Sequence, residues 1–440
     1  MSSLSPSRPN ATHHRERALP LRLALAAALS LCATLAGAQT TTLTLEQALR
    51  LATQASSSNK AAQAAVEASG MAAARADQLP DPMLKLGIDN LPLSGADKYS
   101  TTGDSMTMRR YGFEQQWVSA DKRQARQERA KRAVAMEEGA YLENLGKVRE
   151  EAGKAWLTLL YAQRARQLYG QLEQAMADDL GAAQAAHRGA KATAADVLQS
   201  QMELAQGRDD SRRAAQEVAS ARIVLARWVQ TPVDTVADTP PPMRAHLSTV
   251  PTADLEQYHA GVLNARRAID LADAETTVAL RERRPDWSFE AVFSQRGSQY
   301  GNMLSFGVSI PLTVNRRQRQ DRDVAEKSAL GTKARLQYED ALLEMRAQIE
   351  QMSLELGSLR ERAAQLGATL LPAAQQQVEL AMAAYRSGAG TLSAVFKARR
   401  TLLEKQLQIN ELDKQAALTW ARLELHVIPH DMTNQARTAQ

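Results

Sequence analysis

The chain has 440 residues, and only 4% of them are aromatic. A composition rich in alanine, leucine, glutamine, glutamate and arginine is typical of long helices with narrow seams rather than of ordinary globular domains. The formal net charge is +5, but residues 1–38 hold four arginines and one glutamate. The remainder therefore carries about +2, which gives no argument for a nucleic-acid partner.

The first 38 residues have the pattern of a secretory signal peptide. Arginines precede the apolar run 23–35, and Ala36-Gly37-Ala38 offers a cleavage site of small residues. The only cysteine, Cys32, follows Leu31, which is too large for a lipidation site, so we expect no lipid anchor. No later stretch of 18 apolar residues exists, so any passage through a membrane has to use strands.

Residues 39–230 are predicted to form a first repeat. Apolar residues at helical spacing open a helix from 45 to about 78. Alternation of apolar and polar residues then predicts strands at about 83–91 and 107–117. Arg109 shares the apolar face of the second strand, so it is expected near a membrane edge unless the register is wrong by one. A helix from about 122 to 187, a tip turn at 188–193 and a return helix to about 230 follow.

The same order of elements recurs after a proline-rich linker at 231–251. The second repeat, 252–428, is expected to have strands at about 287–294 and 303–311 and a tip turn at 386–391, before a tail at 429–440. Residues of the two turns match at one offset of 198, namely Arg188 with Arg386, Thr193 with Thr391 and Val197 with Val395. We interpret this as an internal duplication. Thr193 and Thr391 are expected to be helix N-caps, and Asp196 stands at the capping-box position of the first turn.

Helix lengths predict an elongated shape. The helix from about 122 to 187 spans roughly 100 Å at 1.5 Å per residue, and each shorter helix covers about half of that. Two short helices stacked end to end therefore equal one long helix. The tip turns are expected at the far ends of two helical hairpins, about 100 Å from the strands.

The four strands are long enough to cross a bilayer at a tilt, but four strands leave two open edges that lipid does not tolerate. The chain is therefore expected to associate, and three copies giving twelve strands are favoured over two, because eight strands leave little lumen. The alternation predicts lipid contact for Trp287, Phe289, Phe293, Phe306 and Ile310. The alternative is a soluble ribbon of strands packed on the helices.

The stretches "LTLEQALRLA", "LPDPMLKLGIDN", "DKRQARQERA" and "YRSGAGTL", in this order and with the internal duplication, resemble outer-membrane efflux channels of the TolC family. The stretch "LGIDNLPLSGADKYSTTGDSMTMRRYGFEQQW" is most similar to the heavy-metal branch that serves CzcC-type and CusC-type pumps. The resemblance implies a mainly α fold with a small β part. In it, a homotrimer builds a twelve-stranded transmembrane β-barrel that continues into a coiled-coil α-helical barrel.

The resemblance also implies a location and partners. The channel would lie in the outer membrane of a Gram-negative bacterium, in contact with lipid, with most of the chain in the periplasm. It would be a passive exit duct that docks with a periplasmic adaptor and an inner-membrane RND-type pump. Heavy-metal cations are the cargo that the branch favours, and drugs or other organic solutes are the alternative.

In the resembling family the tip turns form the closed periplasmic end and the surface for the adaptor. Thr391 is followed three residues later by Ala394 rather than an acid, so a gate would have to use Asp196 or a mixed ring of Asp196 and Lys397. The alternative is that these residues only shape a turn. The residues expected at adaptor contact or tip closure are Arg188, Gly189, Thr193, Tyr385, Arg386, Gly388 and Thr391.

The chain is not expected to be an enzyme. It has no Ser-His-Asp order, phosphate loop or metal motif, so no catalytic residue, cofactor or bound metal is predicted. His187, His246 and His259 are not expected to form a ligand cluster. A rival function is a periplasmic coiled-coil adaptor or interaction protein, but the lipoyl-like and β-barrel domains of an adaptor are missing from the sequence.

Overall fold

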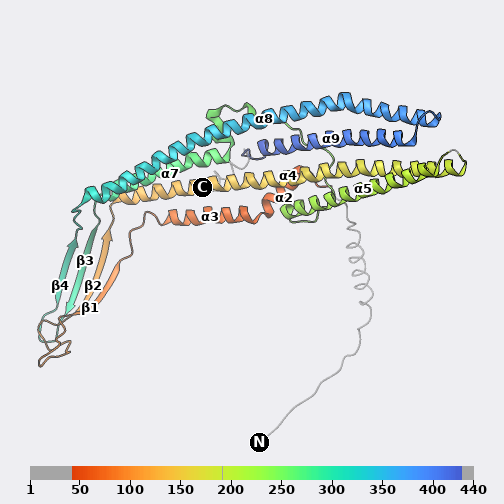
Figure 1. Cartoon of the computed structure of the whole chain (residues 1–440). Helices are drawn as coiled ribbons and strands as arrows, with labels where there is room; N and C mark the ends of the chain where they lie inside the picture. The colour runs from red at the N-terminus through yellow and green to blue at the C-terminus, as the bar shows by residue number, and fades with distance from the viewer. Residues whose placement is uncertain (1–41, 191, 429–440) are drawn as a thin grey trace, which may run out of the picture.

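The structure, a computed structural model, describes residues 42–190 and 192–428. The expected signal peptide at 1–38 and the tail at 429–440 lie outside these residues. Long helices lie side by side in a layer, and a small sheet extends from one end of it (Figure 1). The predicted fold class, mainly helical with four strands and two similar halves, is confirmed at the level of one chain.

Each half has the same order of elements. The first comprises α2 (Leu45–Ala55), α3 (Ser57–Ala74), β1 (Met83–Asp89), β2 (Met108–Trp117), α4 (Ala120–Arg188) and α5 (Ala194–Val229). After two short 3₁₀ helices, the second comprises α6 (Leu255–Tyr258), α7 (Ala260–Glu282), β3 (Trp287–Gln295), β4 (Met303–Ser309), α8 (Gln320–Arg386) and α9 (Leu392–Glu424).

Two helices that were expected to be continuous are broken. Ser56 ends α2 and caps α3, because its hydroxyl accepts a hydrogen bond from the Asn59 N–H while the Asn59 amide donates to the Thr53 carbonyl. His259 has an extended backbone between α6 and α7 and forms an isolated antiparallel β-bridge with Val427. The first predicted helix was expected to run to about residue 78, but α3 stops at Ala74.

Two strands end earlier than expected. β1 stops at Asp89 because Asn90 adopts a positive φ of 54°, which turns the chain. β4 stops at Ser309, two residues before Pro311, which has no N–H to continue a ladder. Ile310 therefore lies just outside β4.

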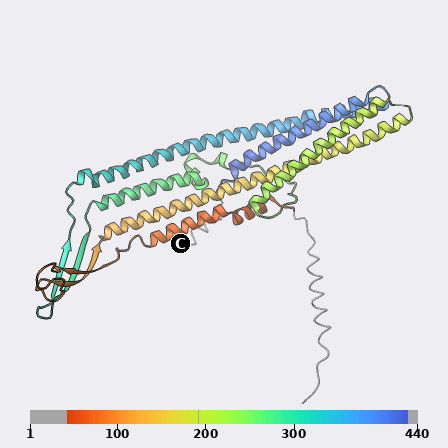
Figure 2. The same ribbon diagram turned by 60° about the horizontal axis from the view of Figure 1, so that its bottom comes forward.

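The helices form a layer in which short helices stack in pairs beside long ones. Helix α4 has 69 residues, about 100 Å, and it contacts α3 and α5 on one side and α7 and α9 on the other (Figures 1 and 2). Helix α8, with 67 residues, packs on α7 and α9. The helices α3 and α7 lie near the sheet, and α5 and α9 lie near the tips. Lengths read from the sequence predict this arrangement.

The sheet is antiparallel in the order β1-β2-β3-β4, so β1 and β4 are open edges. Its register divides the side chains into an apolar and a polar face. The apolar face carries Leu84, Leu86, Ile88, Tyr111, Phe113, Trp117, Trp287, Phe289, Phe293, Leu304, Phe306 and Val308. Arg109 lies on this face, paired with Ile88 and Gln295 at the loop end of β2, so the expected register is right.

The polar face holds a chain of ion pairs. Lys85 contacts Glu114, and also Glu290 at 3.5 Å. Arg110 contacts Asp89 at 3.0 Å and Glu290 at 3.8 Å. The serines of β3 and β4 lie on the same face.

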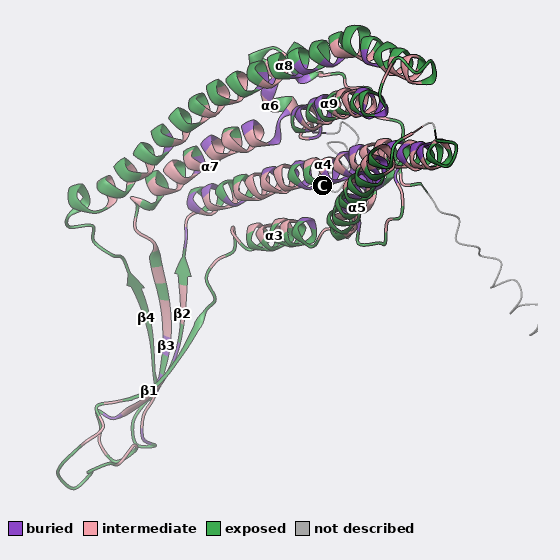
Figure 3. Cartoon of the chain, turned by 45° about the vertical axis from the view of Figure 1, so that its right-hand side comes forward, coloured by how far each residue is buried: buried purple, intermediate pink, exposed green. Residues whose placement is uncertain are grey.

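The apolar core lies at the middle of the layer, where the linker crosses it. Trp156 of α4 is 1% exposed and donates its indole N–H to the Leu43 carbonyl at 2.8 Å. Trp420 of α9 donates to the Arg244 carbonyl of the linker at 3.0 Å. Figure 3 shows buried residues on the inward sides of α4 and α9 and few on the strands. Val236 of the linker forms a β-bridge with Leu43, and Asp238 accepts a hydrogen bond from Arg164 of α4, so the linker is fixed to both repeats.

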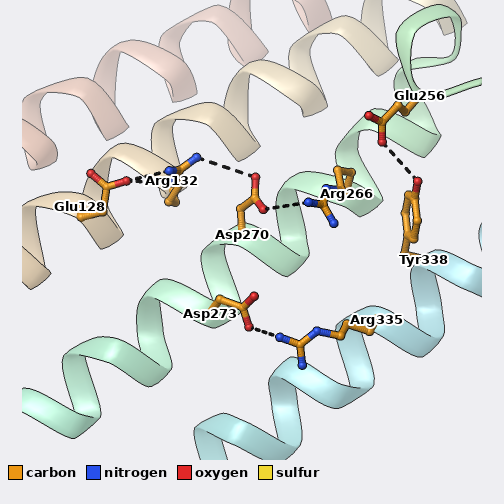
Figure 4. Close-up of polar contacts among 8 residues, drawn as sticks. All are labelled: Glu128, Arg132, Glu256, Arg266, Asp270, Asp273, Arg335 and Tyr338. Carbon is orange, nitrogen blue, oxygen red and sulfur yellow. Dashed lines mark hydrogen bonds and ion pairs between the residues drawn. The ribbon is translucent and has the colours of Figure 1, made fainter. Parts of the chain in front are cut away.

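The upper half of the layer, toward the sheet, is joined largely by ion pairs. From α7, Asp270 contacts Arg132 of α4 at 3.8 Å, and Asp273 contacts Arg335 of α8 (Figure 4). Glu275 bridges Arg129 of α4 and Lys327 of α8 at 2.9 and 3.2 Å. Among the described residues, no helix combines the length and the apolar character needed to span a membrane.

Candidate functional site

The first tip turn is closed by a reciprocal cap. Gly189 follows α4 and donates its N–H to the carbonyls of the last helical turn. The Thr193 hydroxyl accepts from the Asp196 N–H at 3.2 Å, and the Asp196 carboxylate accepts from the Thr193 N–H at 2.9 Å. This is the capping box expected from the sequence.

The second tip turn depends on two glycines. Gly388 has φ +78°, a backbone conformation that L side chains rarely adopt. A Cβ on Gly390 would lie 2.9 Å from the Ala384 Cβ and 3.1 Å from its carbonyl carbon, so no larger residue fits there. Thr391 caps α9 through a 3.4 Å bond from the Ala394 N–H, and Ala394 offers no carboxylate in return.

The two possible gate residues, Asp196 and Lys397, differ in whether the side chain is bound to a neighbour. The backbone N–H and the hydroxyl of Thr193 both donate to the Asp196 carboxylate, and these bonds hold the pKa of Asp196 below its usual range. Asp196 is therefore an ionised group engaged in a cap. Lys397 is exposed, and it makes no ion pair within residues 42–190 and 192–428. Among the described residues of a single chain, Asp196 and Lys397 do not form an ion pair with each other.

The two hairpins are joined to each other just behind the tips. Ala183 of α4 packs with Leu392, Val395 and Phe396 of α9, and Tyr385 lies against this cluster. Arg399 of α9 forms an ion pair with Asp179 of α4 and donates to the Ala175 carbonyl at 3.1 Å. Burial raises the pKa of Asp179 even though Arg399 opposes the shift.

A second ion pair joins Arg400 to Asp210 of α5 at 3.4 Å. It connects the two hairpins at a point further from the ends of α4 and α8 than the Asp179–Arg399 pair. Neither ion pair was predicted from the sequence. The only sequence signal was two adjacent arginines on a helix that is otherwise apolar on its inner face.

The expected contact residues are brought together at one end of the molecule. Both turns lie at the end of the layer that is remote from the sheet (Figure 1). Tyr385 is half-buried, whereas the other expected contact residues of the turns are exposed. The exposed residues are Arg188, Gly189, Thr193, Arg386, Gly388 and Thr391.

The apolar face of the sheet is uncovered by the described chain. Phe306 is 79% exposed, and Trp287, Phe289, Phe293 and Ile310 are also exposed. A contiguous apolar surface of this kind marks contact with a membrane or another protein.

The comparisons with known proteins agree with this geometry. Residues 253–426 match the family model described as "Outer membrane efflux protein". The chain is similar in fold to the Campylobacter jejuni CmeC outer membrane channel, with a TM-score of 0.73, 11% identity, and coverage of 90% of this chain and 88% of that one. No curated protein matches the sequence.

Two further structures share the fold. The open state of the Neisseria gonorrhoeae MtrE outer membrane channel gives a TM-score of 0.70 at 15% identity, covering 87% of this chain and 88% of that one. CusC, described in connection with transmembrane channel formation, gives 0.72 at 14% identity, covering 86% and 90%. The family description and these structures concern efflux proteins and channels rather than enzymes, as expected for this chain.

Proposed function

We propose that this chain, whose residues 253–426 match the outer membrane efflux protein model, is the outer membrane channel of a tripartite efflux system. Three copies would form a passive duct in the outer membrane of a Gram-negative bacterium. The tips would meet a periplasmic adaptor, and an inner-membrane RND-type pump would supply the cargo.

The sheet is the observation that carries this proposal. One face is apolar and exposed, the other holds charges and serines, and both edge strands are unpaired. A closed barrel satisfies all three features, because lipid covers the apolar face, water fills the polar side, and β4 of one copy pairs with β1 of the next. Three copies then supply twelve strands.

The edges of the helical layer fit the same closure. Helix α3 leads into β1 and is rich in alanine, and α8 follows β4 and exposes a stripe of leucines. Leu343 and Leu354 of this stripe are 72% and 76% exposed. Pairing of β4 with a neighbouring β1 brings the leucine edge of one copy beside the alanine edge of the next. The large leucine side chains would then pack against the small alanine side chains.

Heavy-metal cations are the cargo we propose. The resemblance of residues 86–117 to the heavy-metal branch supports this, as does CusC among the similar structures, although the fold of the CmeC outer membrane channel is equally similar. The polar face of the sheet carries Asp89, Glu114 and Glu290 against Lys85 and Arg110, an excess of one negative charge per chain. Such a lining favours cations over anions only slightly.

We propose the exposed residues of the two turns as the adaptor contact. Arg188 and Arg386 occupy equivalent places in the repeats, so a trimer would present six arginines around the end of the tube. An acidic adaptor surface would suit this ring. Lys397 is the residue best placed to add charge inside it, since Asp196 is engaged in its cap.

Membrane fractionation tests the channel. The protein should be recovered with the outer membrane and run in detergent as a heat-sensitive trimer, and purified trimers should give steps of ionic conductance in planar bilayers. A soluble periplasmic monomer would overturn the proposal. A strain lacking the chain should lose resistance to metal salts, whereas loss of resistance to organic solutes alone would keep the channel and reject the metal cargo.

A further inference from the structure

The end of the described chain is attached to the first repeat at one junction. The segment Leu425–Ile428 follows α9 and crosses α4, where Gly146 and Gly153 leave room for His426 and Leu425. Its Ile428 N–H donates to the Tyr258 carbonyl at 3.0 Å, next to the β-bridge between His259 and Val427. The junction therefore joins α4, the start of α7 and the end of α9.

A buried histidine lies at the centre of this junction. His259 is 9% exposed, and its Nδ1 atom has no hydrogen-bond partner among the described residues. Its ring centroid is 5.9 Å from that of His426. The Nε2 atom of His426 is 2.7 Å from a carboxylate oxygen of Glu150. Sequence reasoning did not predict that these two histidines meet.

The surroundings of His259 offer little to hold a positive charge. A cavity of about 270 Å³ adjoins the ring and is lined from α4 by Glu150, from α9 by Arg422, and from the following segment by His426. Glu143 of α4 is the other nearby charge. Helix α8 contributes no charge and lines the cavity with Met345, Gln348, Ile349 and Met352.

The two carboxylates near His259 stay ionised over the pH range in which His259 would gain a proton. Burial raises the pKa of Glu150, but hydrogen bonds from His426 and Lys154 outweigh burial and bring it to about 2. The pKa of Glu143 is also lowered, because bonds from Lys147 and Asn264 outweigh its burial. Both carboxylates therefore stay charged, and a proton on His259 would alter the charge balance of the junction.

No metal site explains the histidines. Among residues 42–190 and 192–428, no three histidine, cysteine, aspartate or glutamate side chains are arranged to hold a metal ion. An imidazole buried without an acceptor for a second N–H is costly to protonate in place.

We propose that His259 makes this junction proton-sensitive, so that acidification releases the segment 425–428 from α4 and from the start of α7. Among the described residues, a proton on His259 gains no carboxylate within hydrogen-bonding distance, and it places a positive charge beside the His426 ring. Opening of the junction would expose the imidazole to water, where it binds a proton readily.

The direction and size of the effect follow from linkage. Burial, together with the charge of His426, lowers the pKa of His259 to about 4, and Glu143 opposes this. Because the pKa in the closed state is depressed, neutral His259 stabilises the junction fully above about pH 6.5, and this stabilisation is lost as the pH falls toward 4. From pH 7.5 to 5.5 the open fraction should rise about tenfold.

Hydrogen exchange followed by mass spectrometry tests this on the full-length protein in detergent. After correction for intrinsic exchange rates, peptides covering 255–262 and 424–428 should lose about tenfold in protection between pH 7.5 and 5.5, while peptides covering the separate cluster around Leu172 and Met176 should not change. His259→Gln should remove the pH dependence, and His187→Gln at the exposed tip should preserve it.

Two outcomes would overturn the proposal. One is wild-type protection at the junction that is equal at both pH values. The other is an unchanged pH dependence in His259→Gln. If His259→Gln loosens the junction at every pH, His259→Asn supplies a second neutral variant, and the wild-type comparison remains decisive by itself. Neither outcome bears on whether the chain is a channel.

Discussion

At the residue scale, the two equivalent turns are unequal in strength. Thr193 has a reciprocal partner in Asp196, whereas Thr391 has one long bond and Ala394 in the partner position. The turn at 386–391 instead depends on Gly388 and Gly390. The second tip is therefore held less by its own cap and more by its contacts with α4, above all through Arg399.

The Asp179–Arg399 pair gives a first prediction. Its side chains are 11% and 19% exposed, so Arg399→Gln leaves a nearly buried carboxylate without its cation. We expect a loss of about 3 kcal/mol in stability, measured as a lower midpoint in denaturant. The double variant Asp179→Asn with Arg399→Gln should recover most of that loss.

The matched control is Arg213→Gln, because Arg213 and Asp209 are 66% and 64% exposed in their pair. A surface pair contributes about 1 kcal/mol or less. Equal losses for the two single variants would contradict the idea that Arg399 has the greater role.

At the element scale, the sequence predicted which elements exist better than where they end. Alternation located all four strands, and the long helices followed from unbroken helical patterns. The breaks at Ser56 and His259 were missed, because both residues interrupt stretches whose composition suits a helix. The first is set by a local cap between Asn59 and Thr53, and the second by the bridge from His259 to Val427, 168 positions along the chain.

The glycines of α4 give a second prediction. Alanine in a helix interior is normally more stable than glycine by about 1 kcal/mol. Gly170 has open space around it, so Gly170→Ala should raise the unfolding midpoint accordingly. Gly153 is different, because a Cβ there would overlap the Leu425 side chain, which is 5% exposed and packed in the core.

We therefore expect Gly153→Ala to destabilise the protein by about 1–3 kcal/mol. Thermal unfolding of the two variants in parallel checks this. If both substitutions stabilise the protein to the same degree, the close packing of Leu425 on α4 is wrong.

At the scale of the whole molecule, helix lengths and the repeat predicted the layer, but not what holds its members together. The contacts between hairpins join residues that are far apart in the sequence, such as Arg399 and Ala175 at 224 positions, and nothing local in the sequence marks such partners. The ion pairs between α4, α7 and α8 were not predicted from the sequence either. The tip residues and the subunit assembly stay predictions.

Ring closure gives a third prediction. Leu343→Gln with Leu354→Gln removes apolar surface that three copies would bury, worth about 1.5 kcal/mol or more for each leucine. The trimer should weaken, as measured by light scattering or by its melting in detergent, while the helical circular dichroism of the chain stays. Glu355→Gln, about 100° round the helix from Leu354, is the matched control and should leave the trimer intact. A trimer unchanged by the leucine substitutions would show that this stripe faces something else.

The position of α4 between both repeats has a consequence for biogenesis. Its upper half packs between α3 and α7, and its lower half between α5 and α9. The N-terminal half of the polypeptide thus lacks one flank of its longest element until the final residues have been synthesised. Truncation at the linker should yield not a stable half-molecule but an unstable chain open to proteolysis, and folding should wait for the last helix to arrive.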